Sequence, residues 1–202
     1  MNIQEEVILT KNFEELYQTV VDPWHQSTIE RYTCDKAIGI NAIERLVSEN
    51  KVKNVIEFGC GLGHFTKRIK NTGVNVLGVD ISQTAIKKAK LNYPDCNFQV
   101  GNISDERFYS PYTVDLIILS EITWYILEDL EKLLSFYKKN LKGVYLLHHL
   151  VFYKKGHQKY GIDKFTDLKE CLKYFGLNYL EYGEISGSKY EDNFRTFFLG
   201  VI

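Results

Sequence analysis

The chain has 202 residues, of which 45% are hydrophobic, and this suffices for one domain with a sizeable core. Its 25 basic and 26 acidic residues leave a net charge of −1, which argues against a nucleic-acid partner, because such partners are held by strongly positive surfaces. The four cysteines are widely spread and include no C-x-x-C pair, so the sequence predicts neither a zinc site nor a disulfide framework. We expect a cytoplasmic location and no membrane partner, since no signal peptide or long apolar stretch is evident.

Apolar periodicity predicts helices and strands that alternate along the chain. Residues 1–21 favour a short helix outside the main sheet, and Pro23 breaks it. Further helices are predicted at 35–50, directly after residue 63, and at 83–92, 128–141 and 167–175. Strands are predicted at 54–58, 74–79, 96–100, 114–119, 143–151, 177–185 and 194–201. Such alternation indicates an α/β fold with a mostly parallel sheet.

A glycine-rich turn follows the first strand, at Gly59, Gly61 and Gly63. Glycines allow a sharp turn and leave no Cβ between the main chain and a ligand, which a nucleotide-like cofactor across the end of a parallel sheet requires. A dinucleotide fingerprint has the spacing G-x-G-x-x-G, whereas here the third glycine comes one residue early and His64 takes its place. Glu57 would oppose a pyrophosphate and suits a ligand with an ammonium group. The local chemistry therefore favours S-adenosylmethionine over NAD.

The segment 57–63 resembles motif I of the class I S-adenosylmethionine-dependent methyltransferases, and 74–82, where Asp80 closes a strand, is similar to their second motif. The resemblance implies a Rossmann-like, seven-stranded, mostly parallel sheet with helices on both faces and a C-terminal antiparallel hairpin. It also implies S-adenosyl-L-methionine as the cofactor. We predict a single methyltransferase domain over 1–202, with an N-terminal helical lid region at 1–50 and an α/β cofactor-binding core at 51–202.

The resemblance also assigns cofactor contacts along the ends of the first four strands. Asp80 is expected to accept hydrogen bonds from the ribose hydroxyls, although a solvated acid at a strand end is the alternative. Ile81 would press against the adenine. Asn102 stands where the family usually has an acid, and its amide can still bond the exocyclic amine. The complete set of predicted cofactor residues is Glu57, Gly59, Gly61, Gly63, Asp80, Ile81, Asn102, Ile103 and Ser120.

Glu121 comes directly after the fourth strand, where the family brings substrate to the methyl group. An acid there could hold an ammonium group or accept a proton, since the nucleophile must be neutral when it attacks. We therefore predict a catalytic role for Glu121, with a helix-starting acid as the alternative. Trp124 and Tyr125 could stack on a sugar or exclude water, and they would serve equally as core aromatics.

A narrower resemblance joins the segment 120–126 with 22–24 and Tyr32. Together they look like the NodS group, which N-methylates the deacetylated sugar of rhizobial lipo-chitooligosaccharides. This likeness implies that Trp24, Tyr32, Trp124 and Tyr125 bind substrate. It makes the amine or hydroxyl of a small molecule the expected methyl acceptor, with a carbohydrate or nucleotide-sugar intermediate as the leading candidate.

Two histidines, His148 and His149, end the fifth predicted strand. Adjacent residues on a strand face opposite ways, so at most one of them points into the site. His148 is the second catalytic candidate, and a structural role is the alternative. No pair of histidines has the spacing of metal ligands, so no metal is predicted.

Two other classes of function stay open. A nicotinamide-dependent oxidoreductase would use the same glycine turn, although the early third glycine and Glu57 count against it. A non-catalytic module that keeps the cofactor fold to bind a partner would share every motif and lack turnover.

Overall fold

A computed structural model describes residues 12–29, 33–109, 114–153, 158–187 and 193–202. These residues form a seven-stranded sheet with the order β3-β2-β1-β4-β5-β7-β6. The strands are β1 (Asn54–Phe58), β2 (Asn75–Asp80), β3 (Asn97–Val100), β4 (Leu116–Ser120), β5 (Tyr145–Tyr153), β6 (Asn178–Ile185) and β7 (Asn193–Val201). The first five run parallel, and β7 pairs antiparallel with both β5 and β6. The predicted seven-stranded fold with its closing antiparallel hairpin is confirmed.

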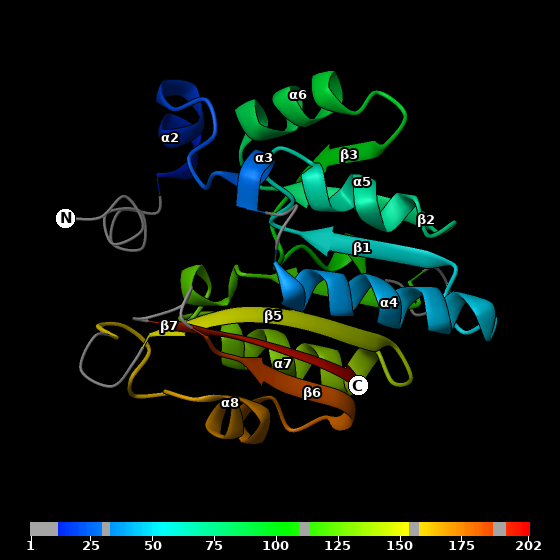
Figure 1. Cartoon of the computed structure of the whole chain (residues 1–202), viewed down its shortest axis with the longest axis vertical. Coiled ribbons are helices and arrows are strands. Elements are labelled where there is room, and N and C mark those ends of the chain that lie inside the picture. The colour runs from blue at the N-terminus through cyan, green and yellow to red at the C-terminus, as the bar shows by residue number, and fades with distance from the viewer. Residues whose placement is uncertain (1–11, 30–32, 110–113, 154–157, 188–192) are drawn as a thin grey trace.

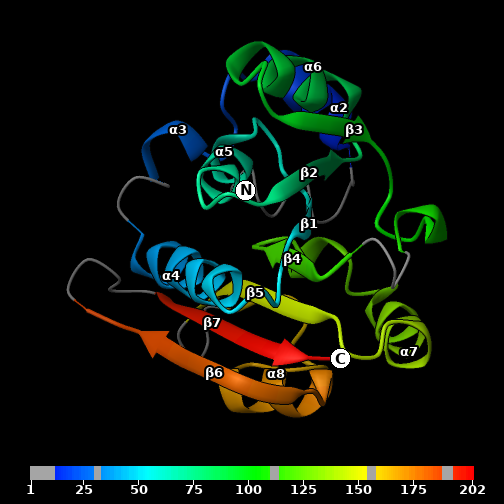
Figure 2. The same ribbon diagram turned by 90° about the vertical axis from the view of Figure 1, so that its right-hand side faces the viewer.

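The central strands are apolar because both faces of the sheet are covered. Leu116, Ile117, Ile118 and Leu119 on β4 are fully buried, as expected for a parallel strand between two helical layers. On one face, α4 (Cys34–Ser48) and α5 (His64–Lys70) pack against the sheet. On the other face lie α7 (Leu130–Asn140) and α8 (Leu168–Phe175). Figure 2 shows α4 and α7 on opposite sides of the sheet.

The N-terminal helices lie beside the carboxyl ends of the strands. Helix α2 (Phe13–Thr19) packs against α6 (Gln83–Asn92), and the one-turn helix α3 (Gln26–Ile29) follows it. Figure 1 shows α2 next to α6, away from α7 and α8. The Glu14 carboxylate fastens α2 to the start of α6 by accepting hydrogen bonds from the hydroxyls of Ser82 and Thr84, both 2.6 Å long. The predicted helical lid region thus contacts the core near the glycine turn.

The predicted elements differ from the observed ones mainly at their ends. Two short 3₁₀ helices, Glu106–Phe108 and Thr123–Tyr125, were not predicted. The second of these turns the chain after β4 and carries two of the predicted substrate residues. In the described part of the chain, no helix is long and apolar enough to cross a membrane.

Candidate active site

A cavity of about 420 Å³ lies at the carboxyl ends of the parallel strands. This is the edge at which ligands bind in open α/β sheets, and the volume falls in the range of small-molecule sites. Six of the nine predicted cofactor residues line it at the ends of β1 to β4, and the N-terminal helices and β7 close its other sides. Its strand-end lining is Phe58, Gly59, Val79, Asp80, Ile81, Gly101, Asn102, Ile103, Ser120, Glu121 and Ile122.

The glycine turn has the backbone that only glycine adopts readily. Gly59 has φ +69° and Gly61 has φ +53°, both in the left-handed region. A Cβ on Gly59 would lie 2.2 Å from Ile122 Cγ2, and one on Gly61 would lie 2.6 Å from Gln26 Oε1. Gly59 therefore lets the loop after β4 approach, and Gly61 lets the N-terminal segment close over the turn.

Asp80 is buried at the end of β2 and lines the cavity. Its Oδ2 accepts a hydrogen bond from the Gly61 amide at 2.9 Å, and its Oδ1 accepts one from the Ser82 amide at 2.9 Å. Burial raises the pKa of Asp80, and these backbone donors oppose that rise. Because a carboxylate offers about four lone-pair positions, acceptor capacity is left for hydroxyl groups of a ligand.

An apolar surface continues from Asp80. Ile81 is 55% exposed although it sits at the cavity wall, and Ile103 lines the same region. Asn102 also lines it, and its side-chain oxygen accepts a hydrogen bond from the Ser104 amide at 2.8 Å. A flat aromatic base would cover this surface, and the Asn102 amide NH₂ is a donor at its rim.

The far end of the cavity holds a cluster of four charged residues from three elements. Glu121, after β4, accepts a hydrogen bond of 2.8 Å from Arg195 on β7. The same guanidinium lies 3.6 Å from Asp35 Oδ2 on α4, and the Lys36 ammonium lies 3.9 Å from Glu121 Oε1. Lys36 and Arg195 lower the pKa of Glu121 against the opposing effect of burial. We conclude that Glu121 is held as a carboxylate.

The backbone at Glu121 is unusual. Its φ of +62° lies in the left-handed region, which non-glycine residues seldom adopt. The Glu121 amide donates to the His149 carbonyl at 2.8 Å, and the ion pair with Arg195 fixes the side chain. Such strain often persists at functional sites, where the surroundings over-determine the conformation.

Aromatic residues from the N-terminus and from the loop after β4 form the roof. Tyr125 packs between Phe13 and Trp24, with ring centroids 5.3 Å and 5.6 Å away. Trp124 is buried and donates its indole N–H to the Val151 carbonyl at 2.9 Å. Trp24, Trp124 and Tyr125 all line the cavity, and their contact with a substrate stays a prediction. Tyr32 lies outside the described residues.

Four predicted site residues are not among the described residues that line the cavity. Glu57 is buried, and its carboxylate accepts a hydrogen bond of 2.5 Å from Thr66 on α5. Gly61 lies under Gln26, and Gly63 faces Phe98, which a Cβ would approach to 2.5 Å. These three residues therefore shape the turn rather than the cavity wall.

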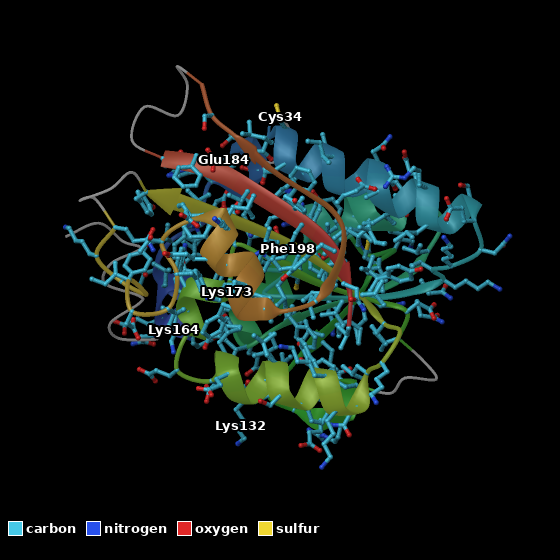
Figure 3. The ribbon with its side chains drawn as sticks, turned by 90° about the horizontal axis from the view of Figure 1, so that it is seen from below. Cys34, Lys132, Lys164, Lys173, Glu184 and Phe198 are labelled. Carbon is cyan, nitrogen blue, oxygen red and sulfur yellow. The ribbon has the colours of Figure 1, made fainter. Side chains whose placement is uncertain are left out.

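His148 is the fourth, and its position argues against the predicted catalytic role. The ring is fully buried and stacks on Phe198 at 4.5 Å between centroids, with Nε2 2.7 Å from Thr123 Oγ1. Figure 3 shows Phe198 beneath α8, on the side of the sheet away from α4. Burial lowers the pKa of His148 to about 3. The prediction that His148 ends the fifth strand is wrong, because β5 continues to Tyr153, and the ring of His148 faces the core.

The sequence interpretation missed several residues that line the cavity, namely Phe13, Tyr17, Gln26, Lys36, Asn193 and Arg195. A signal existed for two of them. Lys36 shares the inward face of α4 with Gly39, Ile43 and Leu46, so a lysine stood at a helical position otherwise apolar or small. Arg195 interrupts the apolar run of β7 in the same way.

Comparison with known proteins agrees with this geometry. Residues 55–143 match the family model described as a methyltransferase domain. The chain is 28% identical over 114 residues to phosphoethanolamine N-methyltransferase of Triticum aestivum, covering 53% of this chain and 23% of that protein. It is 34% identical over 61 residues to ubiquinone biosynthesis O-methyltransferase of Nitrosomonas europaea, covering 30% of this chain and 26% of that protein. The matches thus span about a quarter of the length of these curated relatives.

Among solved structures, the chain is similar to the N-methyltransferase NodS of Bradyrhizobium japonicum WM9, solved with S-adenosyl-L-homocysteine. The TM-score is 0.65 at 18% identity, covering 94% of this chain and 98% of that one. The chain therefore shares the fold of that N-methyltransferase, and its residues 55–143 are similar to a methyltransferase domain. The resemblance inferred from the motifs, with NodS among the structural neighbours, is confirmed.

Proposed function

We propose that this chain is an enzyme that binds S-adenosyl-L-methionine in the cavity and transfers its methyl group to an amine or hydroxyl of a small molecule. The observation that carries the proposal is the position of Asp80, whose carboxylate lies at the end of β2 on the wall of the cavity and next to an apolar surface. The methyltransferase-domain match and the structural neighbour named above support it.

The residues present fit this cofactor. The Asp80 carboxylate suits a ribose diol, and Ile81 and Ile103 suit an adenine ring. Ser120 Oγ lies on the same wall, is buried, and has no hydrogen-bond partner among the described residues. A buried polar atom without a partner costs free energy, so a ligand with its own polar groups would satisfy it.

When bound, the cofactor supplies a methyl group already activated as a sulfonium. The protein then has to align the acceptor, exclude water and accommodate its proton. Tyr125, Trp24 and Trp124 exclude water from the roof. Glu121 is the charged group nearest the end of β4 that could orient an ammonium or hydroxyl group. Its lowered pKa suits a fixed hydrogen-bond acceptor better than a general base.

An amine is the acceptor that the fixed negative charge of Glu121 favours, and a carbohydrate amine or hydroxyl stays our leading candidate. The wheat relative and the NodS neighbour are both N-methyltransferases by name. The aromatic roof would stack on a sugar ring or an aliphatic amine. The single-domain organisation, with residues 1–50 as the lid, is part of this proposal.

The test is turnover. Purified protein is incubated with S-adenosylmethionine and a panel of amino sugars, nucleotide sugars and simple amines and alcohols, and formation of S-adenosylhomocysteine is measured. The proposal predicts acceptor-dependent product that Asp80→Ala reduces. Tight cofactor binding without turnover on any panel member would favour the non-catalytic binding module instead.

A further inference from the structure

Lys36 is a buried cation on the cavity wall whose ammonium group lacks a hydrogen-bond acceptor among the described residues. The residue is 8% exposed and lines the cavity from the first turn of α4. Its ammonium lies 3.9 Å from Glu121 Oε1, too far for a hydrogen bond, and 5.4 Å from the centroid of Phe65. Among the described residues no hydrogen bond to this ammonium is made, although it offers three donors. A cation in this position requires an acceptor.

The neighbouring acids do not meet that requirement. Glu121 already accepts the 2.8 Å hydrogen bond from Arg195, which also lies 3.6 Å from Asp35. Asp35 faces the Arg195 guanidinium as well. Among the described residues, neither acid therefore accepts a hydrogen bond from the Lys36 ammonium.

The strand order places Lys36 on the far side of Gly59 from Asp80. Asp80 is the last residue of β2. Glu121 follows β4, and Lys36 lies beside it. Strand β1, which Gly59 follows, lies between β2 and β4 in the sheet. A ligand with hydroxyls at Asp80 would pass Gly59 and the Ile122 side chain, which both line the cavity, to reach the ammonium. Phe65 beneath Lys36 follows the glycine turn directly, which keeps the ammonium close to that passage.

We propose that Lys36 is an oxyanion-binding residue in the cavity wall, which takes a carboxylate or phosphate group of a bound ligand. This proposal rests on the proposed function, under which such a group has two sources: the carboxylate at the amino-acid end of the cofactor, and an acidic group on the methyl acceptor. In the first case one ligand extends from Asp80 to Lys36. In the second case Lys36 binds an anion beside a cofactor that is already bound.

The first arm of the test is calorimetric titration with S-adenosylhomocysteine and with its decarboxylated analogue, which keeps the ammonium group. Losing a hydrogen bond to a charged group should weaken binding by roughly 10- to 100-fold. If the cofactor is the source, wild type prefers S-adenosylhomocysteine by this factor, Lys36→Met binds the two ligands equally, and Lys36→Arg keeps the preference. Lys132→Met is the matched control, because Lys132 is exposed on α7, as Figure 3 shows.

The second arm adds inorganic phosphate or acetate to protein saturated with S-adenosylhomocysteine. If the acceptor is the source, the wild type and Lys132→Met bind the added anion, Lys36→Met does not, and all three bind S-adenosylhomocysteine equally. Thermal unfolding of Lys36→Met checks that it is folded, and the wild-type preference between the two nucleosides tests the first source without any variant. An unchanged Lys36→Met in both arms would overturn the proposal.

The failure of the proposed function would look different. Wild-type protein that binds neither S-adenosylhomocysteine nor its analogue would contradict the cofactor assignment. Anion titration of the free protein would then decide the role of Lys36 by itself: loss of anion binding in Lys36→Met supports it, and equal binding or no binding overturns it.

Discussion

Arg195 on the C-terminal hairpin donates a hydrogen bond of 2.8 Å to Glu121, 74 residues earlier in the chain. The pair joins β7 to the loop after β4, and Asp35 on α4 approaches the same guanidinium. The ion pair holds the carboxylate of Glu121, a residue of the cavity wall whose backbone is left-handed. The C-terminal hairpin therefore does more than close the sheet, since it holds an acid on the cavity wall.

The first prediction concerns the charge of Glu121. Glu121→Gln keeps the shape of the side chain and removes the charge, so we expect turnover to fall roughly 10²-fold, the usual size of the loss of a positioned catalytic group. Affinity for S-adenosylhomocysteine should hardly change. The measurement is turnover and calorimetry on the same variant. Lost cofactor affinity would move Glu121 into the cofactor site, and retained turnover would leave it without a chemical role.

The pH dependence separates the two roles that Glu121 could play. Lys36 and Arg195 lower the pKa of Glu121. The carboxylate therefore becomes protonated only at a pH below that at which an ordinary glutamate does. We expect no decline in the turnover of the wild type from a Glu121 titration between pH 5 and 8. A decline in this range that Glu121→Gln abolishes would identify a general base with a raised pKa and contradict our interpretation.

The second prediction concerns Asp80. Asp80→Ala removes the group expected to hold the ribose hydroxyls, and losing hydrogen bonds to a charged group costs about 1.5–3 kcal/mol. The dissociation constant for S-adenosylhomocysteine should rise by roughly 10- to 100-fold. Since Asp80 also accepts the amides of Gly61 and Ser82, unfolding is measured in parallel. A folded variant with unchanged affinity would remove Asp80 from the site.

The third prediction concerns the attachment of α2. Hydrogen bonds from Ser82 and Thr84 lower the pKa of Glu14 from 4.5 to about 2. A carboxylate whose pKa is lower in the folded state contributes stability above pH 4.5, and this contribution is lost as the pH falls toward 2. Wild type should therefore be more stable than Glu14→Gln at pH 6, and the difference should shrink between pH 4.5 and 3. Glu15→Gln, also on α2, is the control, and a difference independent of pH would count against this attachment.

The fourth prediction concerns His148. Its pKa is lowered to about 3 by burial, so the unfolded chain binds a proton below pH 6.5 that the folded protein does not. Stability is therefore greatest above pH 6.5 and falls as the pH drops from 6.5 toward 3. The double variant His148→Phe/Thr123→Val removes both hydrogen-bonding partners and should keep most turnover. It should reduce this dependence without abolishing it, because burial lowers the pKa of His149 to about 3 as well. Turnover lost with the fold and cofactor affinity intact would restore His148 as a catalytic candidate.

The fold was predictable because its signals are local. Apolar runs such as 116–119 and the glycine turn at 59–63 report burial and backbone shape directly. Much of the cavity could be predicted from the ends of the strands. Asp80, Asn102 and Glu121 each lie at or just after a strand end, and a parallel sheet brings these ends together at one edge.

The rest of the site depends on the direction in which side chains point and on contacts between residues far apart in the sequence. No local sequence pattern reports either of these. Either of the two adjacent histidines on the fifth strand could have pointed into the site. In the structure α8 and α4 pack on the two sides of this strand, and both histidines are buried. Glu57 looked like a cofactor contact from its place in the motif, yet its carboxylate bonds Thr66 on the following helix. Arg195 reaches Glu121 only through the antiparallel return of β7, which brings together residues far apart in the sequence.

We propose that the cavity at the carboxyl edge of the sheet binds S-adenosylmethionine rather than a dinucleotide. One calorimetric comparison tests it, with S-adenosylhomocysteine and NAD titrated separately into the wild-type protein and into Asp80→Ala. We predict one-to-one binding of S-adenosylhomocysteine that weakens in the variant, and no heat from NAD. Binding of NAD without binding of S-adenosylhomocysteine would contradict this cofactor assignment.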